Sequence, residues 1–164
     1  MSGTLNVTYL DRIVTDKRME LPDGKVRQVA ALVFRVKKGK TEILLVTSRG
    51  TGRWVLPKGW PQVGKTLSQS ARAEAYEEAG ARGEISPFSI GAYTYKKSDL
   101  CPGESGDFIV DVFPMRFSRR VKNWPERGER RLEWMSLEDA IEGVEEPELK
   151  ALIASFDPAL IAVH

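Results

Sequence analysis

The feature that most constrains the fold is a helical pattern between Thr66 and Gly80. Thr66 stands three residues before Gln69, which is the spacing of a capping box, and Gly80 is the residue type that commonly follows the last turn of a helix. Between them, small or apolar residues recur at every fourth position: Leu67, Ala71, Ala75 and Ala79. A stripe of small side chains predicts a helix that packs closely against a sheet.

Segments rich in β-branched and apolar residues predict the strands of that sheet. They lie on both sides of the helix, at Val26–Val36, Thr41–Ser48, Trp54–Pro57, Ser89–Lys97, Asp107–Phe117 and Arg131–Ser136. The turn sequence KKGK between the first two segments favours a β-hairpin. Residues 58–65, between the third segment and the helix, are expected to form a loop.

Two shorter helices are expected further along, at Leu137–Val144 and Pro147–Phe156. The second carries apolar residues at i, i+3, i+4 and i+7, which is the pattern of a helix with one face in the core. The order β-β-β-α-β-β-β-α-α therefore predicts a single α+β domain with a mixed sheet. We assign this domain to residues 26–157, an N-terminal segment of unknown role to residues 1–25, and a C-terminal tail to residues 158–164.

Composition limits the chemistry, because the 164 residues include a single cysteine, Cys101, and a single histidine, His164. A disulfide framework and a cysteine-based zinc site are excluded, and histidine chemistry is not expected. Whatever chemistry this chain performs must therefore use carboxylate, Lys, Arg or hydroxyl side chains. The formal net charge of +2 does not by itself indicate a nucleic-acid-binding protein. With no signal sequence or membrane span in view, we expect a cytoplasmic protein without a membrane partner.

Three acids crowd one face of the expected helix, since Glu74, Glu77 and Glu78 stand at i, i+3 and i+4. Like charges at that spacing repel, so the cluster has two interpretations. It is either a solvated surface rich in glutamate or a binding site for a divalent cation. Magnesium suits the second interpretation, because it prefers oxygen ligands and is usually held by a few carboxylates together with substrate phosphates.

The segment RWVLPKGW and the helix together resemble the signature of the Nudix hydrolases, Gly-x5-Glu-x7-Arg-Glu-U-x-Glu-Glu-x-Gly-U, in which U is a bulky aliphatic residue. Five positions match that signature: Gly59, Glu74, Glu77, Glu78 and Gly80. The resemblance implies an α/β/α sandwich with a loop-helix-loop catalytic motif, and an enzyme that hydrolyses phosphoanhydride bonds. It also implies Mg²⁺, with Mn²⁺ as the alternative ion, held by the helix acids and by the carbonyl group of Gly59.

The chain departs from the signature where Lys65 replaces the first glutamate, Ala73 the arginine and Ala81 the final aliphatic residue. In the family, that arginine orients a catalytic glutamate through an ion pair. Arg72 stands one residue early, about 100° around the helix, so its side chain would have to reach back. The departures leave the role of each acid open.

Within the acid cluster, Glu77 and Glu78 are our first choices as metal ligands. Glu74 is either a third ligand or the base that deprotonates the attacking water, whose pKa a bound metal ion lowers.

Members of the family often recruit a further acid from a distant loop. Glu126 and Glu129 are the main candidates, and we include Glu129 in the expected metal site; Asp111, on an expected strand, is a third candidate. Each of them could equally be an ordinary loop or strand-edge acid.

The stretches AALVFRV, ILLVTSRGTGRWVLPKGW and RRLEWMSLEDAI are similar to the diphosphoinositol polyphosphate phosphohydrolase branch, whose members also hydrolyse diadenosine polyphosphates. A surplus of basic residues between positions 116 and 131 suits such polyanionic ligands, although we expect at least half of them to be solubilising surface. Arg49, Arg53, Lys58 and Arg130 are the expected phosphate contacts. Trp60 could stack on a base or simply close the cleft.

The sequence thus predicts a Mg²⁺-dependent Nudix hydrolase that acts on diphosphoinositol polyphosphates or diadenosine polyphosphates. Nucleoside triphosphates and the 5′ end of an RNA are alternative substrates, and no other nucleic acid is expected as a partner. The alternative of another class is a non-catalytic Nudix-like module that senses a nucleotide.

Overall fold

The computed structural model describes residues 13–15, 26–96 and 107–161. Its centre is a mixed sheet of eight described strands, with the main path β3-β2-β1-β7-β5. The strands are β1 (Val26–Lys37), β2 (Lys40–Thr47), β3 (Trp54–Val55), β4 (Lys58–Gly59), β5 (Ala81–Ile85), β6 (Gly91–Lys96), β7 (Asp107–Arg120) and β8 (Leu132–Ser136). Off the main path, β4 pairs with β1, β6 with β7 and β8 with β2.

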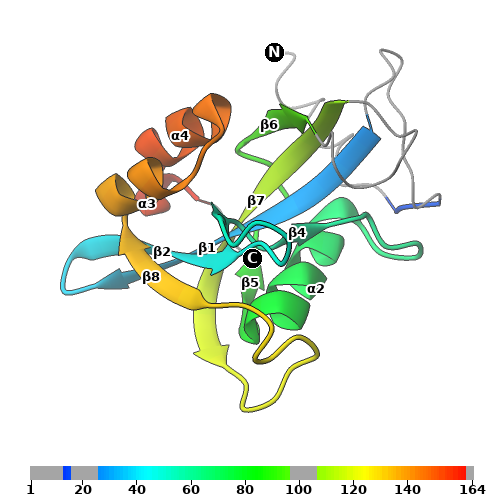
Figure 1. Ribbon diagram of the computed structural model, residues 1–164, viewed down its shortest axis with the longest axis horizontal. Coiled ribbons are helices and arrows are strands. Elements are labelled where there is room, and N and C mark those ends of the chain that lie inside the picture. The colour runs from blue at the N-terminus through cyan, green and yellow to red at the C-terminus, as the bar shows by residue number, and fades with distance from the viewer. Residues whose placement is uncertain (1–12, 16–25, 97–106, 162–164) are drawn as a thin grey trace.

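Helices cover both faces of this sheet (Figure 1). Helix α2 (Leu67–Ala79) lies on one face, and α3 (Leu137–Gly143) and α4 (Pro147–Ala154) lie on the other, followed by a 3-10 turn at Pro158–Leu160. The pairing of β1 with β7 is parallel, whereas the other strand pairs are antiparallel. The expected Nudix-type α/β/α sandwich with a mixed sheet is therefore confirmed.

Strand β1 shows how one sheet serves two cores. Because side chains alternate along a strand, Val29 and Ala31 pack into the core beneath α2, while Ala30 and Leu32 pack into the core beneath α3 and α4. All four side chains are fully buried. A central strand that is buried on both faces has a continuous apolar sequence, so this sequence predicts β1 directly.

Helix α2 begins and ends as its sequence predicts. The Thr66 side chain accepts a hydrogen bond from the backbone N–H of Gln69, and the Gln69 side chain accepts one from the backbone N–H of Thr66. Gly80 follows the last turn in the left-handed conformation, with φ of 65°. A Cβ atom on Gly80 would also lie 2.4 Å from the ring of Trp124, so glycine is required there both for its conformation and for its size.

The strand prediction was wrong in three places. β4 forms within the expected loop, β5 was not predicted, and β7 runs to Arg120 instead of ending at Phe117. β5 has the sequence ARGEI, which lacks an apolar run, and it is an edge strand held by its pairing with β7 across a bulge. Local sequence does not encode such pairing, because the partner strand supplies the hydrogen bonds.

Parts of the terminal segments fall within the described residues. Ile13 forms an isolated antiparallel bridge with Thr66, and Val14 is buried in the core beneath α2. The 3-10 turn at Pro158–Leu160 lies in the expected tail. Cys101 and His164 lie outside the described residues.

Candidate active site

A cleft of about 720 Å³ lies where β4, α2 and the loop after β2 meet. It brings together most of the residues that the sequence singled out: Arg49, Lys58, Gly59, Glu74, Glu77, Glu78 and Arg130. These residues come from segments far apart in the sequence, and the sheet places them side by side. Trp60 lines the same cleft.

Gly59 owes its place in the cleft to its size. Pairing of β4 with β1 sets Gly59 opposite Val29 and presses its backbone against the side chain of Glu74. A Cβ atom at position 59 would lie 2.4 Å from both Cδ and Oε1 of Glu74. A larger side chain at position 59 would displace that carboxyl group, so the glycine of the motif lets Glu74 lie directly against the backbone of β4.

Burial and mutual repulsion make the acid cluster electrostatically unfavourable. Burial raises the pKa of Glu74 well above its usual value, and the neighbouring charges of Glu78 and Glu77 raise it further. Burial also raises the pKa of Glu78, although Arg130 and Lys58 oppose that rise. A cation bound among these carboxyl groups would relieve the repulsion.

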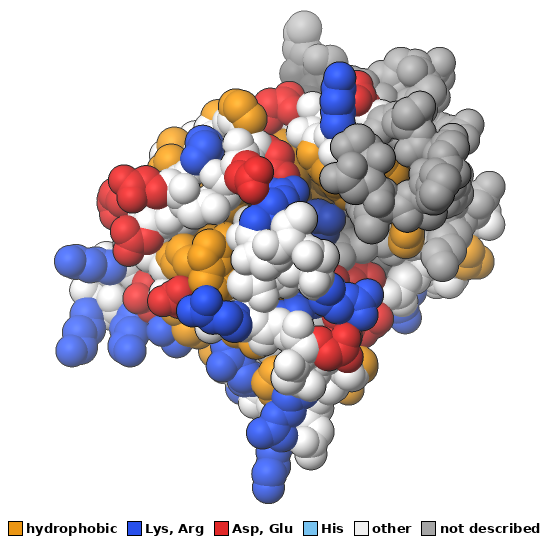
Figure 2. Space-filling view, in the orientation of Figure 1, with side chains coloured by type: hydrophobic (Ala, Val, Ile, Leu, Met, Phe, Trp, Pro, Cys, Tyr) orange, Lys and Arg blue, Asp and Glu red, His pale blue; other side chains and the backbone are white. Residues whose placement is uncertain are grey.

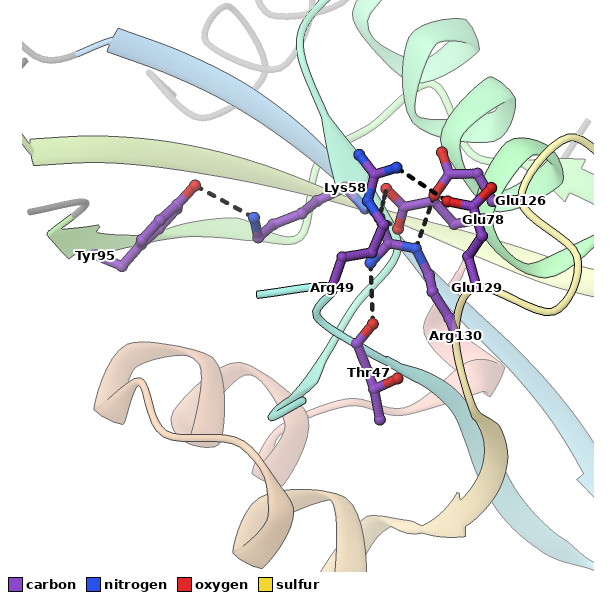
Figure 3. Close-up of polar contacts among 8 residues, drawn as sticks. All are labelled: Thr47, Arg49, Lys58, Glu78, Tyr95, Glu126, Glu129 and Arg130. Atoms are coloured by element: carbon purple, nitrogen blue, oxygen red, sulfur yellow. Dashed lines mark hydrogen bonds and ion pairs between the residues drawn. The ribbon is translucent and has the colours of Figure 1, made fainter. Parts of the chain in front are cut away.

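Arg130 is the cation that contacts this cluster from outside the helix. Its Nη2 atom lies 3.4 Å from Oε2 of Glu78, its Nε lies 2.9 Å from Oε1 of Glu126, and its Nη1 donates a 3.0 Å hydrogen bond to the carbonyl group of Thr47 (Figure 3). The side chain is only 9% exposed. Ala73 stands where the motif has its arginine, and an arginine from the loop before β8 here supplies an ion pair to the cluster.

The loop between β7 and β8 reaches α2 through backbone contacts. The N–H group of Glu126 donates to the carbonyl oxygen of Glu77 at 3.0 Å, and the N–H of Val121 donates to that of Gly80 at 2.9 Å. These bonds satisfy carbonyl groups at the C-terminal end of the helix, which have no partner within it. They also hold Glu126 and Arg130 beside Glu78.

Glu77 is oriented by the loop that precedes α2. The amide Nε2 of Gln62 donates to Oε2 of Glu77 at 3.0 Å, and the backbone N–H of Gln62 donates to the hydroxyl of Ser70 at 2.9 Å. Gln62 is thus tied to the helix at two points. The sequence analysis missed this residue, because a glutamine in a loop has no distinctive pattern.

The structure places the three candidate further acids differently. Glu126 shares Arg130 with Glu78, whereas Glu129 lies 3.1 Å from Arg49 in a largely exposed ion pair. Asp111 is buried beneath the α2 side of the sheet, where it pairs with Arg27 at 2.9 Å, and it does not line the cleft.

Arg53 is the expected phosphate contact that the structure does not bring into the cleft. Its Nη2 atom lies 2.8 Å from Oε2 of Glu146 at the start of α4, and Glu145 lies 3.9 Å away. Arg53 lines a second cavity of about 440 Å³, which Thr94 and Tyr95 also line. From the basic stretch between positions 116 and 131, Arg130 alone lines the main cleft. Over the described part of the face in Figure 2, basic and acidic side chains are intermixed.

The donor chemistry of the cleft fits a divalent cation. Carboxyl groups of Glu74, Glu77 and Glu78 line it, and such hard oxygen donors are those that Mg²⁺ prefers. Among the described residues, no group of three or more acidic, histidine or cysteine side chains is already arranged to hold a metal ion. Glu77 is instead held by Gln62 and Glu78 by Arg130, so metal binding would require these side chains to turn.

Comparison with known proteins identifies the family. A model of the NUDIX domain matches residues 26–156. The chain belongs to the Nudix family. Nudix hydrolase 21 (chloroplastic) of Arabidopsis thaliana is 31% identical over 140 residues, which are 83% of this chain and 68% of that protein. Nudix hydrolase 12 (mitochondrial) of the same plant is 29% identical over 63% of this chain and 52% of its own length.

A relative in the expected branch is diphosphoinositol polyphosphate phosphohydrolase 3-alpha of Mus musculus, 26% identical over 73% of this Nudix chain and 70% of that protein. Among solved structures, the Ap4A hydrolase of C. elegans has a TM-score of 0.54 and 21% identity over 79% of this chain and 94% of that one, a likeness that shows the fold. The prediction of a Nudix hydrolase with relatives in this branch is confirmed. The chain spans between about half and two thirds of the two plant relatives named above.

Nudix hydrolases generally use a divalent metal ion, in keeping with the donor set of the cleft. A Nudix domain from Shewanella oneidensis, 15% identical, was crystallised with ADP ribose. In the described part of this chain, no helix is both long and apolar enough to cross a membrane.

Proposed function

We propose that this Nudix hydrolase requires Mg²⁺, or alternatively Mn²⁺, and cleaves phosphoanhydride bonds in diphosphoinositol polyphosphates or diadenosine polyphosphates. The observation that carries the proposal is the contact between Gly59 and Glu74, which lie against each other in the same cleft as Glu77 and Glu78. A merely solvated acidic surface would give no reason for burying Glu74 against the backbone of a glycine. The burial of like charges therefore favours the cation-binding interpretation of the cluster.

The acids would divide the chemistry among themselves. We assign Glu77 and Glu78 as metal ligands, together with the carbonyl group of Gly59. When bound, the metal ion would lower the pKa of the attacking water and neutralise charge on the phosphate bridge. Glu74 would be a third ligand or the proton acceptor, and its raised pKa makes it a stronger base than an ordinary carboxylate.

A further ligand could come from the loop before β8. Glu126 and Glu129 are the main candidates from the sequence, and Glu129, which we include in the expected metal site, is paired with Arg49 and largely exposed. Glu126 is better situated, since it shares Arg130 with Glu78. We therefore propose Glu126 ahead of Glu129 as the additional acid.

Basic side chains along the cleft would hold the phosphate groups of the substrate. Arg49 and Lys58 are the primary candidates, because both line the cleft with the acids. Arg130 would contact a substrate phosphate while it stays paired with Glu78. Arg53 could reach a phosphate only after its ion pair with Glu146 breaks. We propose residues 26–157 as the catalytic domain and assign no role to residues 1–25 and 158–164. A cytoplasmic location stays a prediction, since relatives include chloroplastic and mitochondrial proteins.

Hydrolysis of a substrate panel by the purified protein tests this proposal. The panel contains diadenosine tetraphosphate, a diphosphoinositol polyphosphate, nucleoside triphosphates, ADP-ribose and 5′-triphosphate RNA, each with and without Mg²⁺. Glu77→Gln is the inactive variant, and Glu138→Gln, which alters an exposed acid of α3, is the matched control. We expect Mg²⁺-dependent cleavage of the first two substrates by the wild type and the control only.

Other outcomes would favour the alternatives. Preferential cleavage of nucleoside triphosphates or of the RNA 5′ end would replace the proposed substrate class. Binding of diadenosine tetraphosphate without cleavage of any substrate would favour the nucleotide-sensing module.

A further inference from the structure

Two side chains of the cleft, Lys58 and Trp60, flank Gly59 and both reach a single aromatic pair. Alternation along the chain points these side chains away from the face on which Gly59 meets Glu74. Lys58 contacts Tyr95, and the ring of Trp60 lies edge-on against Phe108 with 5.7 Å between centroids.

That aromatic pair is a rigid support built by two strands. Tyr95 on β6 and Phe108 on β7 are directly opposite each other in the antiparallel register. Their rings are stacked, with centroids 5.4 Å apart and an interplanar angle of 19°. Directly opposed aromatic residues stabilise a strand pair, so the support is fixed independently of anything in the cleft.

Tyr95 holds Lys58 in two ways. The ammonium group of Lys58 donates a 3.2 Å hydrogen bond to the hydroxyl of Tyr95 and lies 4.8 Å from the centroid of its ring. The same hydroxyl donates to the side-chain oxygen of Gln28, which lines the cleft. A phenol has one proton to donate, so its bond to Gln28 turns an oxygen lone pair toward the lysine.

The position of the lysine matters because of what lies on its other side. The backbone N–H of Lys58 donates to Oε1 of Glu78 at 3.4 Å, and both residues line the same cleft, so the lysine adjoins the acid cluster. Figure 3 shows the side chain extending from this point away from Glu78 and toward Tyr95. If Lys58 were released from Tyr95, its side chain could turn toward the carboxyl groups. Its ammonium group would then compete there with a metal ion, and it would no longer be available to bind a phosphate group.

We propose that Tyr95 is a positioning residue, which holds the ammonium group of Lys58 off the acid cluster and ready for a phosphate group of the substrate. Tyr95 lines the second cavity and does not line the cleft, so it acts through Lys58 and not by contact with the substrate. The inference rests on the proposed function insofar as Lys58 binds a substrate phosphate. It adds a residue from β6 to a site whose candidate metal-binding and phosphate-binding residues come from β4, α2 and loops.

A double-mutant cycle tests this role. The proteins are the wild type, Tyr95→Phe, Lys58→Met and the double variant, with Tyr76→Phe as a control that removes a phenol outside the cleft. Tyr95→Phe keeps the ring and the packing on Phe108 and removes only the hydroxyl. We expect it to raise the KM for diadenosine tetraphosphate about fivefold to tenfold, the effect of one hydrogen bond, with kcat within about twofold.

Lys58→Met is expected to raise the same KM roughly 10- to 100-fold, because a charge-assisted contact is lost. In that background Tyr95→Phe should have no further effect, since its partner is gone. Calorimetric titration with Mg²⁺ alone provides a second readout, in which Tyr95→Phe weakens binding and the double variant restores it to the level of Lys58→Met. Effects that multiply in the double variant, or a change confined to thermal stability, would overturn the proposal.

Failure of the proposed function is distinguishable from failure of this inference. If the wild type cleaves neither diadenosine tetraphosphate nor a diphosphoinositol polyphosphate, the proposed function fails. The same cycle is then run on the Kd for diadenosine tetraphosphate with Mg²⁺ present. Coupling between Tyr95 and Lys58 in that Kd supports the positioning role, whereas additive effects, or the absence of binding, overturn it.

Discussion

Two regions of this protein place an arginine between acids, and they differ in how many buried acids surround that cation. At α2, Arg130 contacts Glu78 and Glu126, yet burial and repulsion still raise the pKa of both Glu74 and Glu78. At the start of α4, Arg53 lies 2.8 Å from Glu146, an acid that is only 8% exposed.

The difference separates a site from a structural contact. A buried ion pair with close geometry fixes two elements in place, and removing one partner leaves an unpaired buried charge. A group of acids that outnumbers its cations is instead at its most stable when another cation arrives. Arg53 and Arg130 looked alike in the sequence, as basic residues near the motif, and only their partners distinguish them.

The largest expected effect comes from Glu74→Gln, which removes one of the three carboxyl groups clustered on α2. We expect hydrolysis to fall about 10²- to 10⁴-fold, because either a metal ligand or the proton acceptor is lost. The metal-free variant should nevertheless unfold at a higher temperature than the wild type at pH 8. Burial raises the pKa of Glu74 to about 9, so the wild type must take up on folding a proton that the unfolded chain has already lost, and glutamine removes that cost.

Activity and the thermal midpoint of Glu74→Gln are measured on the same preparation, with Glu84→Gln on the exposed face of β5 as the control. A variant that is both inactive and less stable would show that Glu74 is an ordinary structural residue.

Glu146→Gln tests the other side of the comparison. We expect the free energy of unfolding to fall by about 3 kcal/mol, because Arg53 is left without its close partner in a largely buried position. The value of kcat should stay within about twofold of the wild type. Chemical denaturation measures the first quantity and a steady-state assay the second. A large loss of kcat in a stable variant would place Arg53 and Glu146 in the functional site.

Gly59→Ala sharpens the account of the cleft. The added Cβ atom would lie 2.4 Å from the carboxyl group of Glu74, so that group must turn. We expect kcat/KM to fall roughly tenfold or more, as misplacement of a catalytic group does, while stability changes by less than about 1 kcal/mol. Gly143→Ala at the end of α3, where the added Cβ atom would lie 3.6 Å or more from its nearest neighbours, is a control for the general cost of replacing glycine. Full activity in Gly59→Ala would contradict the inference that contact with Gly59 positions the carboxyl group of Glu74.

The smallest expected effect concerns a third buried pair, Asp111 and Arg27, which lie 2.9 Å apart. Burial outweighs the arginine and raises the pKa of Asp111 to about 6. The folded state then holds a proton that the unfolded state has already lost, so the free energy of unfolding should fall as pH rises from about 4 to 6. The expected change is on the order of 1–3 kcal/mol.

Denaturation curves at several pH values, compared between the wild type and Asp111→Asn, measure this contribution. The variant should lose that part of the pH dependence, whatever its stability at any one pH. An unchanged pH dependence in Asp111→Asn would mean that other groups cause it.

Sequence predicted the parts of this fold that local patterns encode. Helix α2, its capping box and Gly80 follow from residues within a few positions of one another, and the acids matched a motif of fixed spacing. β5 could not be predicted because its sequence lacks the apolar run that most strands show, and its pairing with β7 holds it in the sheet.

The partners of the site residues could not be predicted for a different reason. The contact of Arg53 with Glu146 spans 93 positions, and that of Lys58 with Tyr95 spans 37. Such contacts depend on the three-dimensional arrangement of strands, which no local pattern in one sequence specifies.

We infer above all that the acids of α2, Glu74, Glu77 and Glu78, form a cation site. Calorimetric titration of the metal-free protein with Mg²⁺ tests this inference most directly. The titration compares the wild type with Glu77→Gln and with Glu146→Gln. The account predicts saturable binding to the wild type and to Glu146→Gln, and binding weakened at least about tenfold in Glu77→Gln. Equal binding by all three proteins, or no saturable binding by the wild type, would contradict it.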